Sequence, residues 1–294
     1  MKIVQSFWSK PFYHKKINTW EGRKAGGWND PLYYYMSCTL SCLLLCKYYT
    51  DVELVTDEKG KELLIDRLKL PYKNVVCQLD KLNNYPEDLW SVGKIYTYSM
   101  QRTPFLHFDS DVFVWKKFER NIETAGLVSQ SKEVNFKYDR IVLKEIFENF
   151  NYLPEAIKQN PPDNDVISCN AGVFGGNDLH FFKQYTDEAF SFIDQNKAKL
   201  DAVNLGLANI IFEQYMFACL ARKKGKDVTY VFPNLTDYFF LKDFKGVPHR
   251  SQYLHIIGPF KKETASEIWI EERLRLEFPA YYYRIKEMSE NKVL

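Results

Sequence analysis

The stretch FLHFDSDVFVW, residues 105–115, decides how the rest of the chain is interpreted. It is apolar almost throughout, which predicts one strand buried on both faces, as in a parallel sheet. Two carboxylates, Asp109 and Asp111, interrupt it across a single serine. At the end of a buried strand they would repel each other and lose hydration unless a cation compensates. Magnesium or manganese is the natural partner. The alternative is that both acids face water or cap a helix.

Patterns of strands and helices alternate before this stretch. Strands are expected at 2–8, 52–57 and 74–79, and helices at 32–48, 59–70 and 87–98. After Trp115 we expect strands at 126–130, 165–176, 228–232 and 253–257, and helices at 138–160, 178–196 and 205–224. This alternation predicts an α/β fold with a mostly parallel sheet flanked by helices. Without a repeat or a flexible linker, residues 1–294 are interpreted as one domain with a C-terminal elaboration.

Composition narrows the class of protein. The 294 residues are 46% apolar and 16% aromatic, which excludes a disordered chain. With 40 basic against 38 acidic residues the net charge is +2, which argues against a nucleic-acid partner. No apolar run approaches the roughly 20 residues of a transmembrane helix, although peripheral membrane contact stays open. Six cysteines without a secretory pattern lead us to expect a reducing cytoplasm.

Three of the cysteines, Cys38, Cys42 and Cys46, recur every four residues in one predicted helix. They could form a zinc or cluster site, but no histidine or fourth cysteine lies near them in the sequence. We therefore predict that these three thiols pack in the core.

A second group that could carry chemistry lies on the predicted strand near the C-terminus. His255, Gly258 and Lys261 follow one another at intervals of three residues. Neutral imidazole ligates metals, glycine lets the backbone approach a phosphate, and lysine supplies a positive charge. The three residues would complete the diphosphate end of a metal site at Asp109 and Asp111.

Two further segments contain residues that could bind a ligand. The small residues Asn170, Ala171 and Gly172 could let a hydroxylated ligand lie against the backbone, although a strand and a turn would have the same composition. Glu213 and Gln214 interrupt an apolar helix, so they either face solvent or line a site.

Taken together and in this order, the four segments resemble the GT-A nucleotide-sugar glycosyltransferases, in particular the retaining branch that includes glycogenin and the bacterial lipopolysaccharide galactosyltransferases. The resemblance implies that Asp109 and Asp111 match the family's Asp-x-Asp, which holds manganese against the donor diphosphate. It implies that His255 is a third metal ligand, that the Gly258 amide binds a phosphate, and that Lys261 binds the diphosphate.

The same resemblance assigns the remaining candidate residues. Asn170, Ala171 and Gly172 would bind sugar hydroxyls, and Glu213 and Gln214 would stand beside the reacting sugar as the catalytic pair, with glutamate where the family commonly has aspartate. Asp57 and Lys94 would contact the donor. The chain would then comprise a nucleotide-binding half (1–115), an acceptor and catalytic half (116–262) and a C-terminal helical extension (263–294).

The resemblance therefore implies a metal-dependent hexosyltransferase that uses Mn²⁺ or Mg²⁺. It would act on a nucleoside diphosphate sugar, with UDP as the family's usual carrier, and transfer the hexose with retention to a carbohydrate, lipid-linked or peptide acceptor.

Two other functions stay open from the sequence. An apolar strand ending in Asp-Ser-Asp-Val also resembles the first motif of the haloacid dehalogenase phosphatases, where the first acid is a phosphorylated nucleophile. Only Asp163 and Asp165 offer a later acid pair for that chemistry. The third interpretation is a sugar- or nucleotide-binding module on a degenerate transferase scaffold, for which aromatic side chains would supply stacking surfaces.

Overall fold

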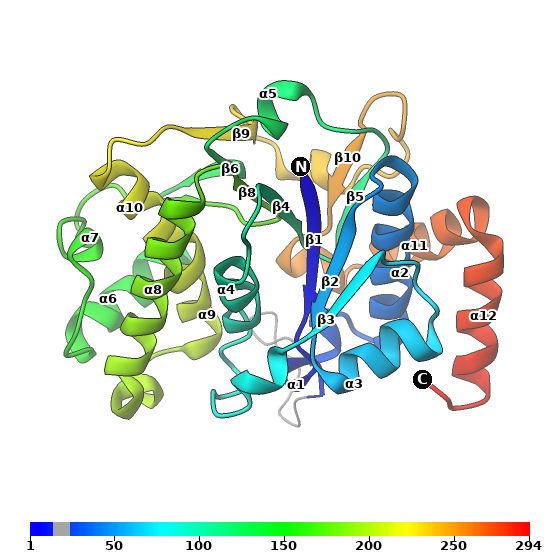
Figure 1. The fold of residues 1–294 in the computed structure, drawn as a ribbon, viewed down its shortest axis with the longest axis horizontal. Coiled ribbons are helices and arrows are strands. Elements are labelled where there is room, and N and C mark those ends of the chain that lie inside the picture. The colour runs from blue at the N-terminus through cyan, green and yellow to red at the C-terminus, as the bar shows by residue number, and fades with distance from the viewer. Residues whose placement is uncertain (14–23) are drawn as a thin grey trace. The chain divides into compact units, whose positions relative to one another are not determined.

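A computed structural model describes residues 1–13 and 24–294 (Figure 1). The chain forms two compact units. Unit 1 comprises Asp88–His107 and Glu119–Leu235, with Met1, and unit 2 comprises Lys2–Glu87, Phe108–Phe118 and Thr236–Leu294.

Unit 2 is built around three parallel strands in the order β3-β2-β1, namely β1 (Lys2–Phe7), β2 (Val52–Thr56) and β3 (Asn74–Cys77). Helix α2 (Pro31–Tyr48) is buried over most of its length. Its start is fixed by Asp30, whose side chain accepts a hydrogen bond from the Leu32 amide, and by Pro31 in the first turn. Helices α11 (Thr264–Glu277) and α12 (Pro279–Glu290) pack against α2 (Figure 1). The apolar faces of these helices form one core with the sheet.

Short elements complete unit 2. Strands β5 (Val112–Val114) and β10 (Tyr253–His255) form a separate antiparallel pair. The short helices are α1 (Ser9–Phe12), η1 (Lys24–Gly27), α3 (Glu58–Lys61), η2 (Glu62–Arg67), η3 (Leu79–Leu82), η6 (Tyr238–Lys242) and η7 (Gly258–Lys262).

Unit 1 is organised around β6 (Leu127–Val134). This strand pairs antiparallel with β7 (Ile167–Cys169) and β8 (Val173–Gly176), and parallel with β9 (Val228–Phe232). Strand β4 (Phe105–Phe108) lies beside β8. A Cβ at Gly175 would lie 2.2 Å from the Phe105 carbonyl oxygen, so this close approach of β8 to β4 requires glycine.

Helices cover the sheet of unit 1, and aromatic side chains fill its core. The helices are α4 (Val92–Ser99), α5 (Arg120–Glu123), α6 (Lys137–Asn149), α7 (Glu155–Lys158), α8 (Leu179–Gln195), η4 (Lys197–Ala202), α9 (Leu205–Ile210), η5 (Ile211–Tyr215) and α10 (Met216–Lys223). Phe174, Phe182 and Phe217 meet in one buried aromatic cluster.

The predicted class, α/β with a mostly parallel sheet flanked by helices, is confirmed. The prediction of one continuous strand over 105–115 is wrong, because β4 and β5 belong to different sheets. The chain turns between them, where the Val112 amide donates to the Asp109 carbonyl. The hydroxyl of Ser41 on α2 donates to the Val112 carbonyl. The two carboxylates therefore lie in a turn held against α2 and not at the end of one straight strand.

Four other predicted elements are also interrupted. The strand expected at 165–176 is divided into β7 and β8 by the irregular residues 170–172, and the helix at 138–160 into α6 and α7, with Pro154 immediately before α7. The helices expected at 59–70 and 205–224 contain the wider π-helical turns η2 and η5. The helix expected to start at 87 starts at Val92.

The prediction for the three cysteines is confirmed for two of them. Cys38 and Cys42 are buried in the core of unit 2, and Cys46 is partly buried against it. Within the described residues, no helix combines the length and the apolar character needed to cross a membrane.

Candidate metal centre and surrounding sites

The three predicted metal ligands lie close together in unit 2. Ligand atoms of Asp109, Asp111 and His255 all lie within 4.8 Å of one another, and no other group of three or more such side chains does so within residues 1–13 and 24–294. Pairing between β5 and β10 brings them together, because His255 lies opposite Val112 and the Ile256 amide donates to the Asp111 carbonyl. His255 Nε2 is 3.4 Å from Asp111 Oδ1.

Lys261 belongs to the same group. Its Nζ lies 2.5 Å from Asp111 Oδ2 and 3.0 Å from the Gly26 carbonyl oxygen. Both side chains of the pair are more than nine-tenths buried. Burial alone would raise the pKa of Asp111, but the charges of Lys261 and His255 outweigh it and hold the pKa well below its usual range. Asp111 is therefore an ionised carboxylate in a buried position.

The donor set fits a divalent cation. Two carboxylates and one imidazole are ligands that manganese and similar ions accept, and Asp111 Oδ1 is a buried oxygen without a hydrogen bond among the described residues. Close by in the sequence, Gly258 has a φ of +42°, and no atom would lie within 4 Å of a Cβ there. Open space beside its backbone leaves room for a ligand to approach.

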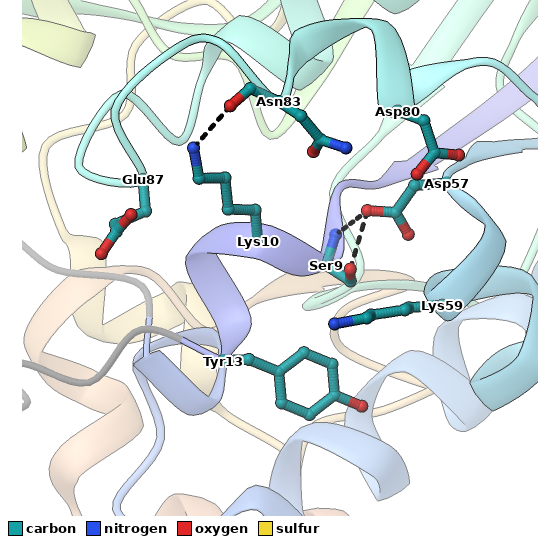
Figure 2. Close-up of a pocket in the computed structure, with 8 residues that line it drawn as sticks. All are labelled: Ser9, Lys10, Tyr13, Asp57, Lys59, Asp80, Asn83 and Glu87. Atoms are coloured by element: carbon teal, nitrogen blue, oxygen red, sulfur yellow. Dashed lines mark hydrogen bonds between the residues drawn. The ribbon is translucent and has the colours of Figure 1, made fainter.

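A separate pocket lies at the carboxyl ends of β1, β2 and β3 (Figure 2). Its volume is about 520 Å³, and it is lined by Ser9, Lys10, Tyr13, Asp57, Lys59, Asp80, Asn83 and Glu87. Crevices in this position commonly bind small molecules in α/β proteins. Asp57, which the sequence assigned to donor contact, lines the pocket, but its carboxylate accepts hydrogen bonds from Ser9 and from the Gly60 amide at the start of α3. The carboxylate therefore also holds the wall of the pocket in place.

In unit 1, two predicted residues form an ion pair that the sequence did not predict. Lys94 Nζ on α4 lies 2.7 Å from Glu213 Oε1 on η5. The Tyr98 hydroxyl donates to the same oxygen at 2.9 Å, and the Tyr185 hydroxyl donates to the Glu213 backbone carbonyl at 2.8 Å. Glu213 neither faces solvent nor stands open at a surface, because its side chain is completely buried. Its neighbour Gln214 is half-buried.

The small-residue segment at 170–172 is the irregular connection between β7 and β8, which both pair antiparallel with β6. The Asn170 side chain is used within the protein, since its Nδ2 donates to Glu133 at 2.8 Å and its Oδ1 accepts from the Gly172 amide. Ala171 is buried. Burial raises the pKa of Glu133 to about 8, so this carboxyl holds a proton at neutral pH.

Sequence reasoning missed Tyr98, Glu133 and Ser9. Each is an ordinary residue in its own segment, and each acts by a hydrogen bond to a candidate residue far away in the sequence. The acid pair at Asp163 and Asp165, which a phosphatase would need, lies in an exposed segment after α7.

Fold and site define an α/β protein with a candidate Asp-Asp-His metal centre. The chain belongs to the family described as "Family of unknown function (DUF6734)", which matches residues 1–288. No curated protein matches the chain.

Similar solved structures include glycosyltransferases. The chain is 11% identical to glycosyltransferase GlyE of Streptococcus pneumoniae TIGR4, with a TM-score of 0.43. The match covers 99% of this chain and 64% of GlyE. The apo form of GlyE is also 11% identical, with a TM-score of 0.44, and the match again covers 99% of this chain and 64% of GlyE. An active-site mutant of LgtC gives 12% identity and a TM-score of 0.38 over 72% of this chain and 70% of that one. The chain thus spans 64% of the length of GlyE.

Proposed function

We propose that the protein is a metal-dependent glycosyltransferase that moves a hexose from a nucleoside diphosphate sugar, with UDP as the expected carrier, to an acceptor hydroxyl with retention. The observation that carries the proposal is the meeting of Asp109, Asp111 and His255, with Lys261 on Asp111. Two carboxylates, an imidazole and a buried ammonium are the groups that a metal–diphosphate complex requires.

Each group has a role in this proposal. A divalent ion, when bound, would neutralise the negative charge that develops on the leaving diphosphate. Asp109, Asp111 and His255 hold the ion, and Lys261 donates to a phosphate oxygen. Gly258 leaves its backbone open to a second phosphate oxygen. The pocket around Asp57 and Asn83 binds the nucleoside, because both residues follow the carboxyl ends of parallel strands.

The test is thermal unfolding with UDP or GDP, each with and without Mn²⁺. A ligand at about 100 times its dissociation constant stabilises a protein by about 2.7 kcal/mol, or about 4 °C for 294 residues. We expect a shift that requires both nucleotide and metal. Asp109→Asn should remove the shift, and this variant carries the test because Asp111 is also needed by Lys261. Asp187→Asn, at an exposed ion pair with Lys183, is the control and should keep the shift.

Other outcomes would overturn the proposal. Equal shifts in the parent protein and in Asp109→Asn would contradict the metal assignment. Release of phosphate from p-nitrophenyl phosphate, without any nucleotide-dependent shift, would favour the phosphatase. Metal-dependent nucleotide binding without slow hydrolysis of any nucleotide sugar would favour a binding module.

A further inference from the structure

The backbone of the turn at 109–112 in unit 2 is held by polar side chains of α2. The Ser37 hydroxyl donates to the Ser110 carbonyl at 3.0 Å, and the Ser41 hydroxyl donates to the Val112 carbonyl at 2.6 Å. Both serines are buried, and they lie on the same face of the helix because they are four residues apart. One face of α2 therefore carries two hydroxyls that hold this turn.

A buried glutamine connects this face of α2 to the sheet of unit 2. Gln5 lies on β1, and its side chain is buried. Its Nε2 donates to the Ser41 hydroxyl at 3.0 Å and to the Asp109 carbonyl at 3.4 Å, and its Oε1 accepts from the Tyr72 hydroxyl at 2.8 Å. Both ends of the amide are thus bonded within the protein. A buried amide in an apolar strand is stable only when it is hydrogen-bonded, and here two of its bonds lead to the turn.

Together these groups fix the whole backbone of the turn. The Ile256 amide donates to the Asp111 carbonyl, so each of the four carbonyls from Asp109 to Val112 accepts a hydrogen bond. None of these bonds uses a carboxylate oxygen. The backbone is therefore held from β1, α2 and β10 without occupying the side chains that would bind a cation.

We propose that Gln5, Ser37 and Ser41 are positioning residues that hold Asp109 and Asp111 in place for a divalent cation. Neighbouring carboxylates repel each other, so a loose turn would relax away from the ligand geometry while no cation is bound. A turn fixed by buried hydrogen bonds keeps that geometry, and a cation then loses less free energy to the ordering of its ligands. The three residues act through the backbone and raise the affinity of the site. This inference rests on the proposed function, and in particular on its metal centre.

Titration with Mn²⁺ tests the positioning role directly. The free ion gives an electron paramagnetic resonance signal that is lost on binding, so the dissociation constant is measured on the full chain without any turnover. Ser41→Ala and Gln5→Met each remove bonds that lead to the turn and keep all three candidate ligands. Loss of hydrogen-bond partners that orient metal ligands typically weakens metal affinity about 10–100-fold, so we expect the dissociation constant to rise about tenfold or more in each variant. Ser37→Ala, which loses a single bond, should raise it about threefold.

Thr56 on β2 provides a matched control variant. Its hydroxyl is also buried in unit 2 and also donates to a backbone carbonyl, that of Phe7 on β1, at 2.7 Å. Thr56→Val removes this bond and should destabilise the protein in urea to a similar extent as Ser41→Ala. It should leave the dissociation constant for Mn²⁺ within about twofold of the parent value, because bonds without a shared partner act independently. Equal losses of Mn²⁺ affinity in Thr56→Val and Ser41→Ala would indicate a merely structural effect and would overturn the inference.

The titration is run with Mn²⁺ alone and with Mn²⁺ and UDP, which separates failure of this inference from failure of the proposed function. If the parent protein binds Mn²⁺ in neither titration, or if Asp109→Asn binds it as tightly as the parent, the metal centre is wrong and the inference fails with the proposed function. If binding depends on Asp109 but is unchanged in Ser41→Ala, Gln5→Met and Ser37→Ala, the inference alone is overturned. The decision rests on those variants that unfold cooperatively in urea without metal.

Discussion

The pair formed by Asp111 and Lys261 leads to the sharpest prediction about stability. The two side chains are 8% and 6% exposed, and their charged atoms are 2.5 Å apart. Asp111→Asn removes the carboxylate from the buried Lys261 ammonium, which still donates to the Gly26 carbonyl at 3.0 Å. Breaking a buried ion pair by removing one partner costs about 3–5 kcal/mol. We expect Asp111→Asn and Lys261→Met each to lower the free energy of unfolding by about that amount.

The double variant provides the decisive comparison. With both charges gone, neither is left buried alone, so Asp111→Asn with Lys261→Met should lose about 3 kcal/mol less than the sum of the two single losses. Urea denaturation at pH 7 without added metal measures all four proteins. If the losses of the single variants simply add, the two groups do not interact and the account of the site is wrong.

The same carboxylate has a defined pH dependence. The folded pKa of Asp111 is well below its usual range, because the charges of Lys261 and His255 outweigh burial. A depressed pKa means that the folded state binds fewer protons than the unfolded state, so its contribution is present above the unfolded value of about 3.9 and is lost as the pH falls through the folded value. The destabilisation caused by Asp111→Asn should therefore shrink below about pH 4. A constant difference between the two proteins from pH 6 to pH 2 would contradict this assignment.

Three further predictions concern unit 1 and the thiols. Because the pKa of Glu133 is raised to about 8, its ionisation opposes folding as the pH rises, and Glu133→Gln should flatten the loss of stability between about pH 5 and pH 8 in urea titrations; an unchanged slope would refute this. Gly175→Ala should cost about 2 kcal/mol or more because its Cβ would meet the Phe105 carbonyl, whereas Gly126→Ala, with open space around it, should cost less than about 1 kcal/mol in the same denaturation assay. Of the six thiols, the partly exposed Cys46 and Cys77 should react with a disulfide reagent in the native protein, and rapid reaction of all six would show that the core assignment is wrong.

The class of fold could be predicted because it depends on local patterns. The apolar segments that precede 105–115 form strands and helices close to the predicted bounds, as β1, α2 and β2 show. The prediction of one continuous strand over 105–115 was wrong. Residues 105–115 are apolar on both sides of Asp109 and Asp111, and apolar character alone does not reveal that the chain turns there. The turn depends on hydroxyl groups of α2, such as that of Ser41, which bond carbonyls far along the sequence.

Part of the candidate site could likewise be predicted from the sequence, and part could not. The grouping of Asp109, Asp111 and His255 was expected from the chemistry of metal ligands and is found in unit 2. The partner of each candidate was not predictable, because Lys261 on Asp111 and Glu213 on Lys94 are contacts between segments that no spacing rule connects. Sequence patterns identify which side chains can do chemistry, whereas burial and pairing decide which of them a ligand can reach.

Three acids, Asp109, Asp111 and Glu213, differ in their burial and in their partners. Asp109 is half-buried, Asp111 is buried but lies beside two potential ligands, and Glu213 is completely buried beside a lysine. A carboxylate can serve a ligand directly only where an open coordination or hydrogen-bond position remains, and Glu213 has no exposed side-chain surface for one. The carboxylate of Glu213 is paired with Lys94, whereas those of Asp109 and Asp111 lie within 4.8 Å of a third potential ligand on His255. Three acids that look alike in the sequence thus have two different kinds of surroundings, and only Asp109 and Asp111 have those of a candidate metal ligand.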